Sequence, residues 1–113
     1  MRQGEIWLIN LEPTIGAEIK KTRPAIIVND NSLGKLPLRV IVPLTDWKEH
    51  YNLAPWMIKI ETTLKTGLTK DSSADCFQVR SVSINRFIKK IGSIDTNISE
   101  EIKTGLSCVL SIE

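Results

Sequence analysis

Apolar residues in this chain occur mainly in short runs, which predicts a protein built from β-strands. The runs are rich in β-branched residues, are too short for typical helices, and are separated by Pro, Gly, Asn, Asp and Ser. They cover residues 5–11, 24–28, 38–45, 55–60, 74–82 and 87–91. Short strands divided by turn signals in this way favour a closed or nearly closed barrel.

Pro43 interrupts the run at 38–45. Proline has no backbone N–H to donate to a sheet, so it is found mainly on edge strands and at bulges. We therefore expect this strand to lie at an edge of the sheet, or to bulge at Pro43.

Only the end of the chain has the period of a helix. Its apolar residues recur at spacings of three and four, at Ile98, Ile102, Leu106, Val109 and Leu110. Asn97 is expected to cap this helix, with Glu100 reaching back as in a capping box. Glu100 and Glu101 would then lie in the first turn, where they suit the helix dipole. Gly105 costs a helix about 1 kcal/mol relative to alanine, so packing must hold this helix in place.

The composition is that of one ordinary folded domain spanning residues 1–113, with 42% hydrophobic and 25% charged residues. No apolar run approaches the roughly 20 residues that a membrane span needs, and no signal peptide precedes the first strand. These features predict a cytoplasmic protein. Cys76 and Cys108 lack the spacing of metal ligands and are expected to be small buried residues, while His50 stands alone in a polar stretch, so no metal site is expected.

The formal net charge, 15 − 13 = +2, is too small to identify a nucleic-acid partner by itself. The positive residues are concentrated, however, in a first basic cluster (Lys20, Lys21, Arg23) and a second basic cluster (Arg86, Lys89, Lys90). If the fold brings the clusters together, they form a phosphate-binding surface; otherwise each is a solvated face.

Polar residues also stand where strands begin or end. Pro24 keeps Arg23 extended, so its guanidinium leaves the start of a strand in a form suited to grip a phosphate with two N–H groups. The alternative is a surface arginine paired with Glu18. Thr45 ends an apolar strand, and its hydroxyl can either donate to a phosphoryl oxygen or serve as an ordinary strand-end group.

Gln78 and Arg80 should share one face of the strand expected at 74–82, because alternate residues of a strand face the same way. Inside a small barrel they would need partners, which a bound nucleotide or a neighbouring subunit could supply. The alternative is a polar stripe facing solvent.

Taken together, these segments resemble the MazF/PemK toxins. The N-terminal pattern is the most specific part, and the order of the segments follows the family over almost the whole chain. The matching pieces are residues 4–8, 11–16, Glu18, 22–24, 42–45, 78–81 and the helical tail after Gly92.

The resemblance implies a CcdB/PemK-like, SH3-type β-barrel that forms a homodimer. It implies a metal-independent endoribonuclease without a cofactor, which cuts single-stranded RNA, chiefly mRNA, at short sequences. The products would be 2′,3′-cyclic phosphate and 5′-hydroxyl ends. It also implies an antitoxin whose acidic, largely disordered tail lies over the RNA groove.

In the family, the positions of Arg23 and Thr45 are the catalytic pair, and the loop before Arg23 contacts RNA. Carried onto this chain, the RNA-binding residues are Thr14, Lys20, Lys21, Thr22, Gln78 and Arg80. Some members have a carboxylate at the position of Phe77 or a histidine at that of Ala17, and Ile19 stands where Gln is frequent. Two alternatives therefore remain open: Arg23 and Thr45 suffice, or Glu18 is the general base.

Two other functions are compatible with the same fold. A CcdB-like gyrase poison would act by binding, but such proteins end in Trp-Gly-Ile, whereas this chain ends in Leu-Ser-Ile-Glu. A catalytically silent PemK-like module would only bind a partner. Incubation with a long RNA in EDTA would separate these functions from a metal-independent nuclease.

Overall fold

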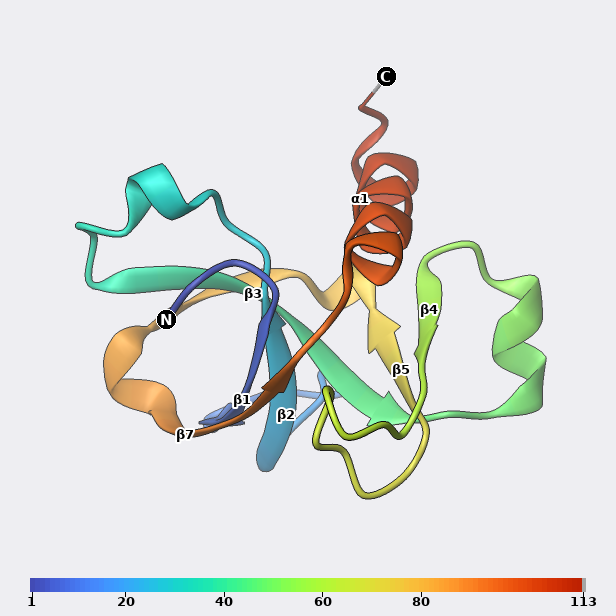
Figure 1. The fold of residues 1–113 in the computed structure, drawn as a ribbon, viewed down its shortest axis with the longest axis horizontal. Coiled ribbons are helices and arrows are strands. Elements are labelled where there is room, and N and C mark those ends of the chain that lie inside the picture. The colour runs from blue at the N-terminus through green and yellow to red at the C-terminus, as the bar shows by residue number, and fades with distance from the viewer. Residues whose placement is uncertain (113) are drawn as a thin grey trace.

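The computed structural model describes residues 1–112. It contains one antiparallel sheet and one C-terminal α-helix (Figure 1), as the sequence predicts. The elements are β1 (Glu5–Asn10), β2 (Thr22–Ile27), β3 (Leu38–Asp46), β4 (Met57–Ile60), β5 (Ser72–Asp75), β6 (Arg80–Ser83), β7 (Phe87–Ser93) and α1 (Thr96–Leu110). The strand order is β4-β5-β3-β2-β1-β7, with β6 also paired to β3, so β4 and β7 end an open sheet rather than closing a barrel.

β3 is the centre of this sheet, so the expectation of an edge strand is wrong. One side of β3 pairs with β2, and the other side pairs first with β6 and then with β5. The β6 pairing ends at Ile41 and the β5 pairing begins at Leu44. Pro43 lies in the gap between these two ladders and is fully buried. The sheet therefore accommodates its missing N–H by changing partner strands.

The two faces of the sheet build two cores because alternate residues of each strand point to opposite sides. A larger core lies on the face covered by α1 and includes Ile6, Ile26, Val42, Leu44, Ile60 and Ile102. A smaller core lies on the other face and is formed by Ile9, Leu11, Ala25, Ile27, Ile41 and Val82. Arg23 and Thr45 continue the side-chain alternation of this second face.

The single strand expected over residues 74–82 is instead two strands joined by a 3-10 turn at Cys76–Gln78. The carboxylate of Asp75 accepts a hydrogen bond from the backbone N–H of Phe77 at 3.1 Å and a second from the Gln78 amide at 3.0 Å. A short side-chain acceptor that captures nearby N–H groups favours a turn over a continuing ladder. β5 therefore ends at Asp75.

The helix begins earlier than predicted, and Asp95 rather than Asn97 is its N-cap. The Asp95 carboxylate accepts a hydrogen bond from the Ile98 N–H at 2.9 Å, while its own backbone is extended. Glu100 and Glu101 consequently lie beyond the first turn and form no capping box.

Gly105 allows α1 to approach the sheet closely. A Cβ atom at this position would lie 2.9 Å from the sulfur of Cys76, so the residue that weakens the helix locally also lets it pack. Burial, together with the nearby Asp75 carboxylate, raises the pKa of the Cys76 thiol to about 12, which keeps it protonated and unreactive. Cys108 is exposed, so the expectation of burial is wrong for that cysteine. Within residues 1–112, no helix is long and apolar enough to cross a membrane.

Candidate RNA-cleavage site

The pairing of β2 with β3 brings Arg23 and Thr45 to the same place. Ala25 is opposite Pro43 in the ladder, and continuing this register by two residues sets Arg23 opposite Thr45. Both side chains line a hollow of about 130 Å³. The other lining residues are Pro24, Leu44, Asp46, Leu68, Thr69, Lys70 and Ser72. Arg23 and Thr45, which the resemblance implies as a catalytic pair, are therefore neighbours in the sheet, although 21 residues lie between them in the sequence.

Arg23 and Thr45 both present polar groups that the protein leaves available. Neither side chain makes a hydrogen bond or an ion pair within residues 1–112, and both are partly exposed. The alternative pairing of Arg23 with Glu18 is not observed, because a Glu18 carboxylate oxygen accepts instead from the Ile15 N–H at 2.6 Å. At the rim of the hollow, the Asp46 carboxylate forms an ion pair with the Lys70 ammonium, with an N–O distance of 3.2 Å.

A second, larger hollow of about 510 Å³ adjoins the first along β3, with Pro43 lining one and Thr45 the other. The loop between β1 and β2 supplies one wall and the segment 77–80 the other. It is lined by Leu11, Ala17, Glu18, Ile19, Pro43, Phe77, Gln78, Val79 and Arg80. The structure thus gathers Glu18, Gln78 and Arg80 in one depression, apart from the hollow of Arg23 and Thr45.

Gln78 and Arg80 find their partners in the β1–β2 loop. The Gln78 side-chain oxygen accepts from the Ile19 N–H at 2.6 Å, and Arg80 donates to the Leu11 carbonyl at 3.5 Å. Both residues therefore fix the loop as well as line the hollow. Of the remaining predicted RNA-binding residues, Lys20, Lys21 and Thr22 are exposed and Thr14 is partly buried.

The two basic clusters lie on either side of β1. Leu8 is opposite Pro24 of β2 on one side and Lys89 of β7 on the other. A further hollow of about 460 Å³ contains Lys89 and Lys90 and shares Pro24, Leu68 and Thr69 with the Arg23 hollow. The fold therefore brings parts of both clusters to one continuous depression.

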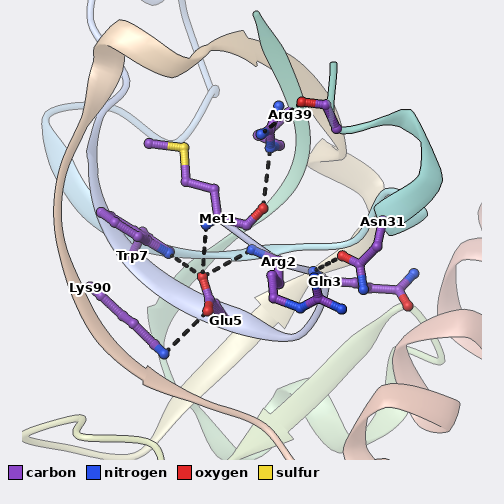
Figure 2. Close-up of polar contacts among 9 residues, drawn as sticks. Met1, Arg2, Gln3, Glu5, Trp7, Asn31, Arg39 and Lys90 are labelled. Carbon is purple, nitrogen blue, oxygen red and sulfur yellow. Dashed lines mark hydrogen bonds and ion pairs between the residues drawn. The ribbon is translucent and has the colours of Figure 1, made fainter. Parts of the chain in front are cut away.

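Two members of the second cluster are already engaged. Arg86 donates to the backbone carbonyls of Asn10 and Glu12 and so holds the start of the β1–β2 loop. Lys90 forms an ion pair with Glu5 at 3.2 Å (Figure 2). Lys89 is exposed and makes no ion pair or side-chain hydrogen bond within residues 1–112.

Glu5 is the centre of the polar network in Figure 2. Its carboxylate accepts from the Trp7 indole N–H at 2.9 Å and the Arg2 backbone N–H at 3.0 Å, and the Met1 amine lies 3.5 Å away. Desolvation alone would raise the pKa of Glu5, but the donors from Trp7, Arg2 and Lys90 and the amino-terminal charge lower it to about 2. Glu5 is therefore a structural carboxylate that ties β1 to β7.

The comparisons with known proteins agree with this geometry. Residues 2–110 match the family described as "PemK-like, MazF-like toxin of type II toxin-antitoxin system". The chain belongs to this family. The resemblance drawn from the sequence is thereby confirmed.

Relatives of this PemK-like toxin include Endoribonuclease MazF9 of Mycobacterium tuberculosis, 32% identical over 83% of this chain and 82% of that protein. Endoribonuclease PemK of Escherichia coli is 29% identical over 98% of this chain and 83% of its own length. Among solved structures, MazF of Deinococcus radiodurans superposes with a TM-score of 0.83 at 19% identity, covering 99% of this chain and 97% of that one. A mycobacterial endoribonuclease in complex with its cognate antitoxin superposes with a TM-score of 0.78 at 16% identity. The match covers 100% of this chain and 97% of that one.

The described part of the toxin, residues 1–112, contains no group of three His, Cys, Asp or Glu side chains placed to hold a metal ion. Ala17 and Phe77 both line the larger hollow, and neither side chain can donate or accept a proton. Phe77 is 66% exposed.

The sequence analysis missed an aromatic group just beyond Thr45. Trp47 packs edge-on against Tyr51, with ring centroids 5.9 Å apart, and the Lys59 ammonium lies 5.2 Å from the Trp47 ring centroid. The position of Trp47, two residues after Thr45, was a signal in the sequence. The approach of Lys59 was not, because it depends on the pairing of β4 with β5.

Proposed function

We propose that this toxin is a metal-independent endoribonuclease that cleaves single-stranded mRNA at short sequences. One observation carries the proposal: Arg23 and Thr45, distant in sequence, line one hollow, and their donor groups have no hydrogen-bond or ion-pair partner within residues 1–112. It is supported by membership of the PemK-like toxin family and by relatives whose names state endoribonuclease activity.

The proposed reaction uses the RNA's own 2′-hydroxyl as nucleophile. Its oxygen attacks the adjacent phosphorus, the bond to the 5′-oxygen breaks, and the products are a 2′,3′-cyclic phosphate and a 5′-hydroxyl. The phosphoryl group gains negative charge in the transition state. Arg23 stabilises that charge with paired N–H donors, and the Thr45 hydroxyl donates to a non-bridging oxygen. Arg23 also delivers a proton to the leaving oxygen, while its persistent positive charge makes it unsuited to act as the base.

We assign the general base to Glu18. Asp46 is held by Lys70, which leaves Glu18 as the carboxylate of the two adjoining hollows that no cation pairs within residues 1–112. Glu18→Gln keeps an acceptor for the Ile15 N–H but cannot take a proton. It should lower the cleavage rate about 10²-fold or more with RNA affinity retained. Unchanged cleavage by this variant would mean that Arg23 and Thr45 suffice.

The RNA strand is proposed to cross both hollows. The β1–β2 loop contributes Thr14, Lys20 and Lys21, the start of β2 contributes Thr22, and the opposite wall contributes Gln78 and Arg80. Lysines on an exposed loop attract phosphates without reading sequence. We further propose that the toxin acts in the cytoplasm as a homodimer, and that a cognate antitoxin with an acidic, disordered tail covers this path. The solved neighbours include an endoribonuclease in complex with its cognate antitoxin.

The decisive experiment incubates the purified toxin with a long RNA in millimolar EDTA. The expected outcome is discrete fragments with cyclic-phosphate and 5′-hydroxyl ends, identified by end-labelling. Activity that disappears in EDTA and returns with Mg²⁺ would contradict the mechanism. A protein that binds RNA without cutting it would instead be a silent module of the same fold.

A further inference from the structure

A row of polar side chains crosses the sheet next to Thr45. In the ladders, Thr45 is opposite Ser73 of β5, and Ser73 is in turn opposite Lys59 of β4. Residues directly opposite on antiparallel strands point to the same face. Strands lie about 4.8 Å apart, so the Lys59 backbone is about 10 Å from that of Thr45. Lys59 thus extends the Arg23–Thr45 site across the sheet.

Trp47 stands beside this row, two residues beyond Thr45. Its indole N–H donates to the Glu49 carboxylate at 3.2 Å, and Tyr51 packs against it edge-on. The Lys59 ammonium rests over the ring. Lys59 is exposed and Trp47 is partly exposed, so the group over the Trp47 ring is a surface side chain and not part of the core.

Ser73, in the middle of the row, carries a hydroxyl that the protein does not use. The side chain is fully buried, and its oxygen has no hydrogen-bond partner within residues 1–112. Buried hydroxyls are normally paired, since leaving one unpaired costs free energy. A ligand that formed a hydrogen bond with the Ser73 hydroxyl would remove this free-energy penalty.

We propose that Trp47, Lys59 and Ser73 form a subsite for one nucleotide next to the scissile phosphate. The base stacks on Trp47 in place of the Lys59 ammonium, which swings to the phosphate of the same nucleotide. The movement uncovers Ser73, whose hydroxyl donates to that nucleotide. The exchange is favourable because stacking of a base on an aromatic ring is stronger than an exposed cation–π contact. This subsite rests on the proposed function, since it presupposes an RNA in the Arg23 hollow.

Two carboxylates near this row, those of Asp46 and Glu49, are already engaged by other groups. Asp46 also lines the Arg23 hollow, but its carboxylate is paired with the Lys70 ammonium. Glu49 accepts from the Trp47 edge and also from the Asn52 amide at 3.4 Å. Glu49 therefore fixes the ring orientation while its charge is partly satisfied.

The test uses an oligonucleotide of a mapped cleavage site with 2′-deoxyribose at the attacking position, so that it binds without being cut. Trp47→Ala should weaken binding about 5- to 150-fold, while Trp47→Phe, which keeps a ring, should recover most of the loss. The Trp47→Ala loss should vanish when the base of one flanking nucleotide is removed. Lys59→Ala should reduce the salt slope of log K by about 0.7, whereas Lys35→Ala, which changes an exposed lysine in the turn before β3, should not.

Ser73→Ala separates a ligand-binding hydroxyl from a structural one. It should weaken oligonucleotide binding severalfold while leaving the melting temperature unchanged or higher, because it removes an unpaired buried group. Trp47→Ala binding within twofold of the unmodified toxin, or an equal loss with every abasic oligonucleotide, would overturn the subsite. Failure of the unmodified toxin to bind or cut any RNA would instead contradict the proposed function.

Discussion

At the scale of single residues, the guanidinium of Arg23 is the group on which the proposed chemistry depends most. Replacing it by lysine keeps the charge but loses the planar pair of N–H donors that matches two phosphoryl oxygens. Arg23→Lys should therefore lower the cleavage rate about 10²–10³-fold. Single-turnover cleavage of a short RNA measures this loss. Arg2→Lys is the matched control, because Arg2 is exposed and lies outside the hollow. A fully active Arg23→Lys toxin would place the chemistry elsewhere.

The residues of the site differ in how far sequence could predict them. Arg23 and Thr45 were both recognisable as polar residues at strand ends, but their role as a catalytic pair was assigned through the family resemblance. Their adjacency follows from the β2–β3 register, which is a long-range property. Lys59 and Ser73 could not be placed beside Thr45 without the β5 pairing.

At the scale of elements, Glu5 links the start of β1 to β7, and its charge should make this link sensitive to acid. The folded-state pKa of about 2 is below the ordinary value of 4.5, so the carboxylate contributes stability above pH 4.5 and loses it as the pH falls toward 2. The Glu5 side chain is 15% exposed, so solvent screens this contribution little.

Glu5→Gln should therefore cost on the order of 2–3 kcal/mol of unfolding free energy at pH 7. The difference between the variant and the unmodified toxin should shrink as the pH falls from 5 to 2.5. Urea titrations at fixed protein concentration across this range measure it. Lys90→Ala, which removes one donor and leaves three contacts, should cost less. A difference independent of pH would mean that Glu5 acts through packing and not through its charge.

The type of each element was more predictable than its ends. The apolar runs identified the strands, because burial decides their pattern. The start of α1 and the break between β5 and β6 were missed for a common reason. In both places an aspartate, Asp95 or Asp75, captures a backbone N–H two or three residues onward and sets the boundary. Such local competition is invisible to hydrophobic periodicity.

At the scale of the whole molecule, a mainly β fold with a C-terminal helix followed from the sequence, but an open sheet centred on β3 did not. The change of partner strand at Pro43 requires β5 and β6 to be separate strands, and the turn between them was not foreseen. The same arrangement creates the two adjoining hollows. Their joint path, together with the loop lysines, determines which large ligands the toxin can take.

Lys20 and Lys21 provide a test of whether RNA and the proposed antitoxin tail share this path. Both are exposed on the loop that walls the larger hollow, and neither forms an ion pair within residues 1–112. Phosphates and tail carboxylates should seek the same cations. The double change Lys20→Ala, Lys21→Ala should therefore weaken both ligands together and flatten the salt dependence of both. Exposed charges interact over a Debye length of about 10 Å at 0.1 M salt, so association should also slow most at low salt.

The change Lys35→Ala, Lys65→Ala is a matched control, because it removes the same charge from exposed lysines outside the two hollows. Stopped-flow measurements with a non-cleavable RNA and with an acidic peptide give the association rate and affinity of both ligands under the same conditions. A uniform effect of net charge predicts equal losses for the two double variants. A shared path predicts a larger loss for the loop variant, and competition between RNA and peptide for one site. If the loop variant bound one ligand normally and lost the other, the two would occupy different surfaces, and inhibition by the antitoxin would have to act at a distance.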